Sequence, residues 1–115
     1  MNYSYIDTTP EGNYTVKVQE NENVPIVKET DYIYFDVDQD TFKLQTGFKN
    51  NITVKKTNFQ DCIIYNPWIN KARTLEDLGE ENYPNMMCFE VGRVTKPIEL
   101  EAGGVYEGGQ LITVE

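Results

Sequence analysis

The chain has 115 residues, 39% of them hydrophobic, which suffices for one domain with a single core over residues 1–115. Its 10 basic and 19 acidic residues give a formal net charge of -9, which repels phosphates and excludes nucleic acid and membranes as partners. No apolar run approaches the ~20 residues that span a bilayer, and the polar start has no signal-peptide pattern, so we expect a cytoplasmic protein.

The first half of the chain has the alternating pattern of strands. Residues 14–19 alternate apolar and polar side chains, which is the period of a strand with one buried face. Residues 32–37 show the same period, and residues 41–45 follow them after a short polar turn. The apolar side chains expected to share one face are Ile33, Phe35 and Val37. We therefore predict a hairpin between 32–37 and 41–45.

The middle of the chain contains two further strands and one helix. Residues 52–56 alternate again, and residues 61–65 form a more continuous apolar run that suits a buried strand. Helix-forming residues predominate from 69 to 78, and Gly79 follows as a stop, so one short helix or a helical turn is expected. Further strands are predicted at 86–94, 98–100 and 109–114.

This order of elements predicts an all-β fold. Short strands with one helical excursion are typical of an antiparallel β-sandwich and not of alternating βαβ units. The chain contains no histidine, so Ser-His-Asp and Cys-His nucleophilic sites are excluded. Asp36, Asp38 and Asp40 begin a calcium-loop pattern, but Thr41 stands where a glycine is required, so we expect a solvated turn and no metal site.

Two unusual local features single out candidate functional residues. Asn66-Pro67-Trp68 follows a predicted strand and places the only tryptophan on a connection, where a flat aromatic surface suits stacking on a sugar. Core packing is the alternative for Trp68, and general burial preferences favour it. Glu90 lies in an otherwise apolar strand. Its carboxylate either faces solvent, which strand alternation favours, or points into a cleft as a general base.

A series of motifs runs along the chain with a characteristic order and spacing. The segments that carry it most specifically are residues 65–72, 77–79, 86–90, 96–98 and 106–110, with weaker motifs at 5–7 and 29–34. Taken together they resemble the C-terminal hallmark of glucose-6-phosphate 1-epimerases, in the galactose-mutarotase-like superfamily. The resemblance spans nearly the whole chain, with its specific part at 61–115.

The resemblance implies a fold, an activity and a set of site residues. Family members are large antiparallel β-sandwiches that interconvert the α and β anomers of hexose 6-phosphates without a metal or organic cofactor. This chain would be part of such a supersandwich, with a hexose phosphate or other sugar as ligand. By position in the motifs, Glu90 corresponds to the catalytic glutamate and Asp31 to an aspartate that holds sugar hydroxyls. Trp68 and Asn66 would line the substrate pocket.

The same resemblance implies that the site is incomplete. The family's histidines, one of which protonates the ring oxygen, and its phosphate-binding residues belong to an N-terminal half without a counterpart here. Loss of a general acid costs about two to four orders of magnitude in rate, so we expect no activity from the chain alone. A separate N-terminal half or a homodimer would complete the site. The alternative is a non-catalytic module for carbohydrate binding or protein association, in which Glu90→Gln would leave function unchanged.

Overall fold

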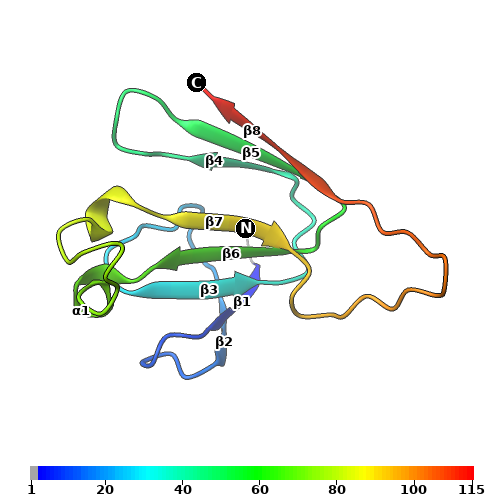
Figure 1. Cartoon of the computed structure of the whole chain (residues 1–115), viewed down its shortest axis with the longest axis horizontal. Coiled ribbons are helices and arrows are strands. Elements are labelled where there is room, and N and C mark those ends of the chain that lie inside the picture. Colours follow the sequence, from blue (N-terminus) through cyan, green and yellow to red (C-terminus); the bar gives the residue numbers. More distant parts are fainter. Residues whose placement is uncertain (1–2) are drawn as a thin grey trace.

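The computed structural model describes residues 3–115 and consists mainly of β-strands and their connections (Figure 1). One antiparallel sheet has the strand order β2-β1-β3-β6-β7, and a second has the order β4-β5-β8. The strands are β1 (Ser4–Asp7), β2 (Thr15–Val18), β3 (Thr30–Tyr34), β4 (Thr41–Leu44), β5 (Ile52–Thr57), β6 (Asp61–Asn66), β7 (Cys88–Gly92) and β8 (Gly109–Val114). The helical segments of the described part are α1 (Trp68–Ala72) and the 3-10 turn η1 (Tyr83–Asn85). This confirms the predicted all-β antiparallel sandwich with one short helix.

The five-stranded sheet has an inner face that packs toward the other sheet. The buried residues at the centre of this core are Tyr32, Tyr34, Val37 and Cys62. Phe42 of β4 joins the two sheets, because its ring centroid lies 5.1 Å from that of Phe89 on β7. Burial of such side chains stabilises the fold by about 1.5–3 kcal/mol each. The core therefore depends on a few large aromatic residues.

We call the opposite surface of the five-stranded sheet the outer face. Residues that are directly opposite each other on paired strands point to the same side of a sheet, so the register defines this face. Its residues on β1, β3, β6 and β7 include Ile6, Asp31, Ile33, Ile63, Tyr65, Cys88 and Glu90. Polar and apolar side chains are thus mixed on a surface that faces away from the core.

The hairpin predicted between 32–37 and 41–45 is wrong. β3 pairs with β1 and β6, whereas β4 pairs with β5 in the other sheet. The connection at 35–40 therefore crosses from one sheet to the other. The predicted common face of Ile33, Phe35 and Val37 is also wrong, because Ile33 lies on the outer face whereas Val37 is buried in the core.

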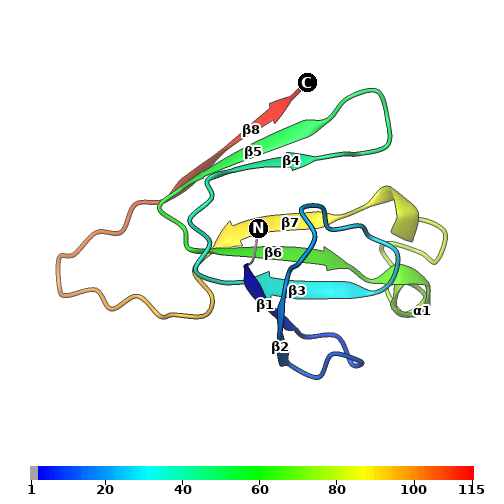
Figure 2. The same ribbon diagram turned by 180° about the vertical axis from the view of Figure 1, so that it is seen from behind.

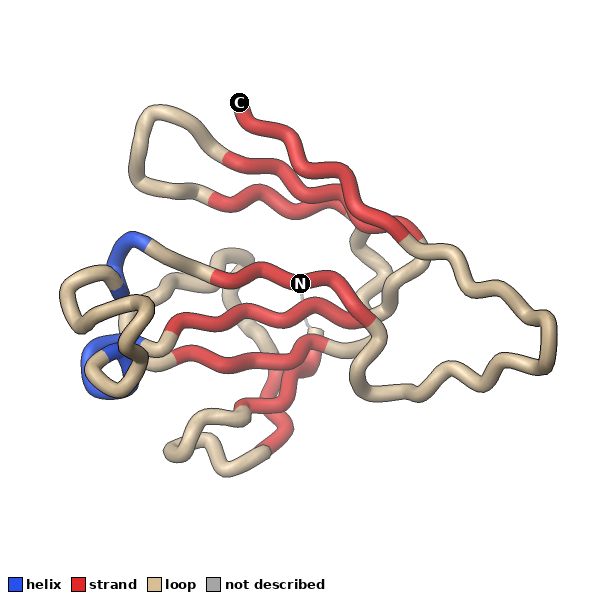
Figure 3. Tube along the Cα trace, in the orientation of Figure 1, coloured by secondary structure: helices blue, strands red, loops and turns tan. Residues whose placement is uncertain are grey.

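Three other elements differ from the predictions. β1 was not predicted, and it is only four residues long. α1 ends at Ala72 and not at residue 78, because the following backbone N–H groups of Thr74 and Leu75 bond to carbonyls only three residues earlier, as in tight turns. Residues 98–100 lie in the long loop at 93–108, drawn in tan in Figure 3, and not in a strand. No helix within residues 3–115 is long and apolar enough to cross a membrane.

The two sheets leave an open groove between them. In Figures 1 and 2 the sheets lie close where the 93–108 loop leaves and separate toward their other end. The groove has a volume of about 1250 Å³, and its apolar lining includes Tyr34, Ile64 and Phe89 from one sheet and Phe42 and Leu44 from the other. Core side chains that line open space lose the packing contacts of a closed interior.

β8 is exposed along its length. It pairs only with β5, so its other edge offers unpaired backbone groups. Leu111, Ile112 and Val114 are 63%, 57% and 64% exposed, and they lie on both faces of the strand. Apolar side chains on both faces of an unpaired edge strand are the pattern of a strand that is covered by further polypeptide.

Candidate functional site

The structure places Glu90 and Asp31 on the same face of one sheet. Glu90 lies at the middle of β7, opposite Ile63 of β6, and its side chain is exposed, as strand alternation predicts. Asp31 lies on β3 opposite Tyr65, and it is half-buried. Asp31 and Glu90 are two strands apart across the sheet and two residues apart along the strand direction. This places their Cα atoms about 12 Å apart. The outer face therefore carries two carboxylates.

Tyr65 and Lys71 extend this surface, and neither was predicted as a site residue. Tyr65 pairs with Asp31 on one side and Cys88 on the other, so its ring shares the outer face with both. The Nζ atom of Lys71 on α1 lies 5.4 Å from the centroid of the Tyr65 ring, in range for a cation–π interaction. Both residues fall within the motif at 65–72, which is the sequence signal that could have identified them.

Asn66 lies at the end of β6 and is buried, with 2% of its surface exposed. Its Nδ2 group donates hydrogen bonds to the carbonyls of Tyr83 at 2.9 Å and Met86 at 2.8 Å. Its Oδ1 atom accepts a hydrogen bond of 2.7 Å from the backbone N–H of Trp68. Both N–H donors of the amide are thus engaged with the chain's own backbone, and burial leaves the side chain little surface for a direct sugar contact.

Trp68 is the first residue of α1 and is half-buried. Its ring packs edge-on against Tyr83, with 4.8 Å between ring centroids. Its backbone is in the left-handed region, with φ of 59°, which is uncommon for a bulky side chain. The indole is therefore neither in the central core nor free in solvent, and it lies at the end of the sheet where Asp31 and Tyr65 are found.

The sequence of this chain matches a known protein family. The sequence model of the family described as "Aldose 1-epimerase" matches residues 5–113. The chain belongs to the aldose 1-epimerase family. The partial sandwich observed here agrees with an incomplete mutarotase-like fold. No solved structure gave a match.

Two curated proteins are similar to this chain. Both carry the name "Putative glucose-6-phosphate 1-epimerase". The protein from Cenchrus ciliaris is 29% identical over 90 residues, which are 78% of this chain and 27% of the relative. The protein from Haemophilus influenzae is 26% identical over 103 residues, which are 86% of this chain and 37% of the relative. The chain thus spans only about a third of the length of these relatives.

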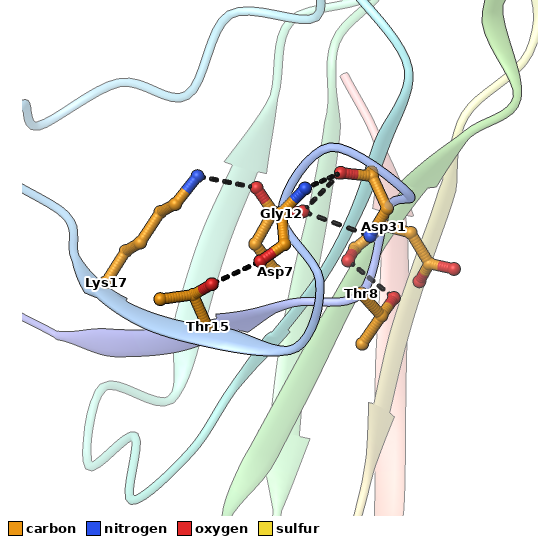
Figure 4. A network of polar contacts seen from close by, with 7 residues as sticks. Asp7, Thr8, Gly12, Thr15, Lys17 and Asp31 are labelled. Carbon is orange, nitrogen blue, oxygen red and sulfur yellow. Dashed lines mark hydrogen bonds and ion pairs between the residues drawn. The ribbon is translucent and has the colours of Figure 1, made fainter.

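A buried polar network holds the backbone of Asp31 in this family member (Figure 4). Asp7 is 2% exposed, and its carboxylate accepts hydrogen bonds from the Thr9 backbone N–H at 3.1 Å and hydroxyl at 2.6 Å. The Lys17 Nζ atom lies 2.8 Å from the same carboxylate. Thr8 donates both its backbone N–H, at 2.9 Å, and its hydroxyl, at 2.8 Å, to the Asp31 carbonyl. The network therefore fixes the part of β3 that carries Asp31.

Within residues 3–115, no group of three or more Asp, Glu, Cys or His side chains is arranged to hold a metal ion.

The Asp7 network makes the stability of the fold dependent on pH. Burial raises the pKa of Asp7, but hydrogen bonds from Lys17 and Thr9 outweigh burial and hold the pKa below its usual range. A carboxyl group with a lowered pKa in the folded state stabilises the fold fully above about pH 4, and this stabilisation is lost as pH falls through the folded-state pKa. We expect Asp7→Asn to lower the free energy of unfolding by about 1–3 kcal/mol at pH 7. The difference in free energy of unfolding between Asp7→Asn and the wild type should become smaller near pH 2.

Urea unfolding at pH 7, 4 and 2 measures this difference. The exposed Asp77 provides a matched control, since Asp77→Asn removes a carboxylate of the same kind outside the network. A destabilisation by Asp7→Asn that stays constant from pH 7 to pH 2 would show that the carboxylate charge does not stabilise the fold.

Proposed function

We propose that this chain is the C-terminal part of a glucose-6-phosphate 1-epimerase-like domain and that its outer face forms one wall of a hexose 6-phosphate site. The observation that carries the proposal is the placement of Glu90 and Asp31 on the same face of one sheet, with Tyr65 on that face as well. The separation of about 12 Å between their Cα atoms leaves room for one sugar ring held between the two side chains. A phosphorylated hexose as substrate also favours a cytoplasmic location.

The exposed carboxylate of Glu90 has the chemistry of a general base. It would take the proton of the anomeric hydroxyl while the bond between the anomeric carbon and the ring oxygen breaks and the ring oxygen takes up a proton from an acid. Rotation of the resulting aldehyde, followed by closure with the protons returned, gives either anomer. Asp31 would accept hydrogen bonds from sugar hydroxyls, and Trp68 would supply apolar surface at the end of the site.

The acid that this reaction needs is a histidine in the family that the sequence resembles, and these 115 residues contain none. We propose that a polypeptide carrying the N-terminal part of the same domain supplies it. The open groove between the sheets and the exposed strand β8 support this, because both are apolar surfaces of the kind that further strands cover. The share of the relatives' length that the chain spans is consistent with such a missing part.

Nuclear magnetic resonance exchange between the anomers of glucose 6-phosphate tests this proposal. We expect the purified chain to give the same exchange rate as buffer at neutral pH. Addition of a polypeptide with the N-terminal part of the Haemophilus influenzae relative should raise the rate, and analytical ultracentrifugation should show one copy of each chain in the complex.

Two outcomes of this experiment would contradict the proposal. Catalysis by the chain alone, abolished by Glu90→Gln, would mean that a homodimer or larger oligomer builds a site without histidine. A complex that forms but neither binds nor anomerises the sugar would favour the second candidate function, a non-catalytic module. The exposed apolar residues of β8 favour protein association as the role of such a module.

A further inference from the structure

The turn between β6 and α1 holds a strained residue in a fixed position. Trp68 takes a left-handed backbone conformation, with φ of 59°, which is unfavourable for an aromatic residue unless its surroundings impose it. The preceding Pro67 is fully buried and has its own φ at -68°, so the chain enters the turn in a single direction. Something adjacent to the turn must therefore stabilise the conformation of Trp68.

The side chain of Asn66 supplies that stabilisation. Its Oδ1 atom accepts the backbone N–H of Trp68 at 2.7 Å, which closes a local turn over Pro67. Its Nδ2 group reaches across to the carbonyls of Tyr83 and Met86, on the segment whose Tyr83 ring packs against the indole. One buried amide thus connects the backbone of Trp68 with the segment that supports its ring.

We infer that Asn66 is a positioning residue, whose buried amide holds the Trp68 indole in place at the end of the outer face before any sugar binds. The role of the indole in sugar binding rests on the proposed function, but its positioning by Asn66 does not. A side chain that is already ordered loses little conformational freedom when a ligand arrives, so its contact contributes more to affinity. Asn66 would act on the sugar through Trp68 without touching it.

Trp68 is the only tryptophan in the chain, so fluorescence excited at wavelengths that tyrosine does not absorb reports on this position alone. Asn66→Ala removes all three hydrogen bonds. Asn66→Asp keeps an acceptor for the Trp68 N–H but replaces the group that donates to the Tyr83 and Met86 carbonyls. Loss of one such bond is expected to lower the ratio of molecules with an ordered Trp68 turn to molecules with an open turn about fivefold. Emission should shift to longer wavelength and acrylamide quenching should increase in both variants, because Asn66→Asp turns a buried carboxylate toward the two carbonyl oxygens.

Asp61 provides a matched control at the other end of β6. It is 1% exposed, and its Oδ2 atom accepts hydrogen bonds of 2.8 Å from the backbone N–H groups of Val94 and Thr95. Asp61→Asn should therefore lower overall stability while Trp68 emission and quenching remain as in wild type. All proteins are compared at a temperature where circular dichroism shows them folded.

The results separate the inference from the proposed function. Wild-type emission and quenching in Asn66→Ala or Asn66→Asp, or an equal change in Asp61→Asn, would overturn the positioning role. Titration of the complex of both chains with glucose 6-phosphate then tests the sugar contact, and Asn66→Ala should weaken binding by at least about fivefold, the effect of losing one such bond. A wild-type complex that does not bind the sugar, together with the expected change in Asn66→Ala emission, would overturn the sugar site and leave the positioning of Trp68 intact.

Discussion

Substitution of Glu90 by glutamine is expected to slow anomerisation of glucose 6-phosphate by about two to four orders of magnitude in the complex of both chains. Glutamine has nearly the same shape but cannot accept the proton of the anomeric hydroxyl. Because Glu90 is exposed, the substitution should not change the free energy of unfolding. The loss should fall on kcat and leave KM within about twofold, since the amide can still hydrogen-bond the bound sugar.

The measurement is the exchange rate between anomers over a range of glucose 6-phosphate concentrations. Glu99 lies in the 93–108 loop and is exposed, so Glu99→Gln makes the same chemical change outside the proposed site. We expect Glu99→Gln to match wild type. Equal kcat values for Glu90→Gln and wild type would remove Glu90 from the reaction and support the non-catalytic alternative.

The largest effect on stability is expected from Lys56. This lysine is 6% exposed, and its Nζ atom donates hydrogen bonds of 2.8 Å to the carbonyls of Val37 and Phe59. It thereby ties β5 to the crossover at 35–40 that joins the sheets. Hydrogen bonds from a charged donor contribute about 1.5–3 kcal/mol each, and removal of a buried charge offsets part of their loss. We expect Lys56→Met to lower the free energy of unfolding by about 2–4 kcal/mol.

Lys55 is the natural control because it is the neighbouring residue on β5 and is exposed. Lys55→Met removes the same charge from the same strand without leaving a buried carbonyl unpaired. Urea unfolding followed by circular dichroism should show a change below about 0.5 kcal/mol for Lys55→Met. Similar losses for the two variants would mean that the two carbonyls find other partners and that the buried lysine does not hold the sheets together.

The sequence predicted strands where alternation or a continuous apolar run was clear. β5, β6 and β8 lie within a residue or so of the predicted ranges, because their patterns are set by burial or pairing along the whole strand. Prediction failed at the connection after Tyr34. A short polar turn between two strands is typical of a hairpin, and the crossover between sheets is determined by tertiary packing that no local pattern records.

The candidate site was only partly accessible to sequence reasoning. Alternation predicted the exposure of Glu90, and the resemblance supplied its role. The placement of Asp31 on the same face depends on β3 being a neighbour of β6, which the sequence pattern did not indicate. The carbonyls that accept hydrogen bonds from the Asn66 Nδ2 group belong to residues 17 and 20 positions further along the chain. Such contacts between distant segments follow from the fold and not from local sequence.

Because side chains alternate between the two faces along β6 and β7, the two thiols of the chain lie on opposite faces of the sheet. Cys62 lies on the inner face at 3% exposure, and burial raises the pKa of its thiol to about 11. Cys88 is half-buried and lies on the outer face two residues before Glu90. Since reaction requires an accessible thiolate, a maleimide dye should attach to Cys88 well before Cys62. The unmodified sequence therefore already offers a single attachment point for an optical probe beside the proposed catalytic carboxylate, from which docking of a second polypeptide could be followed in real time.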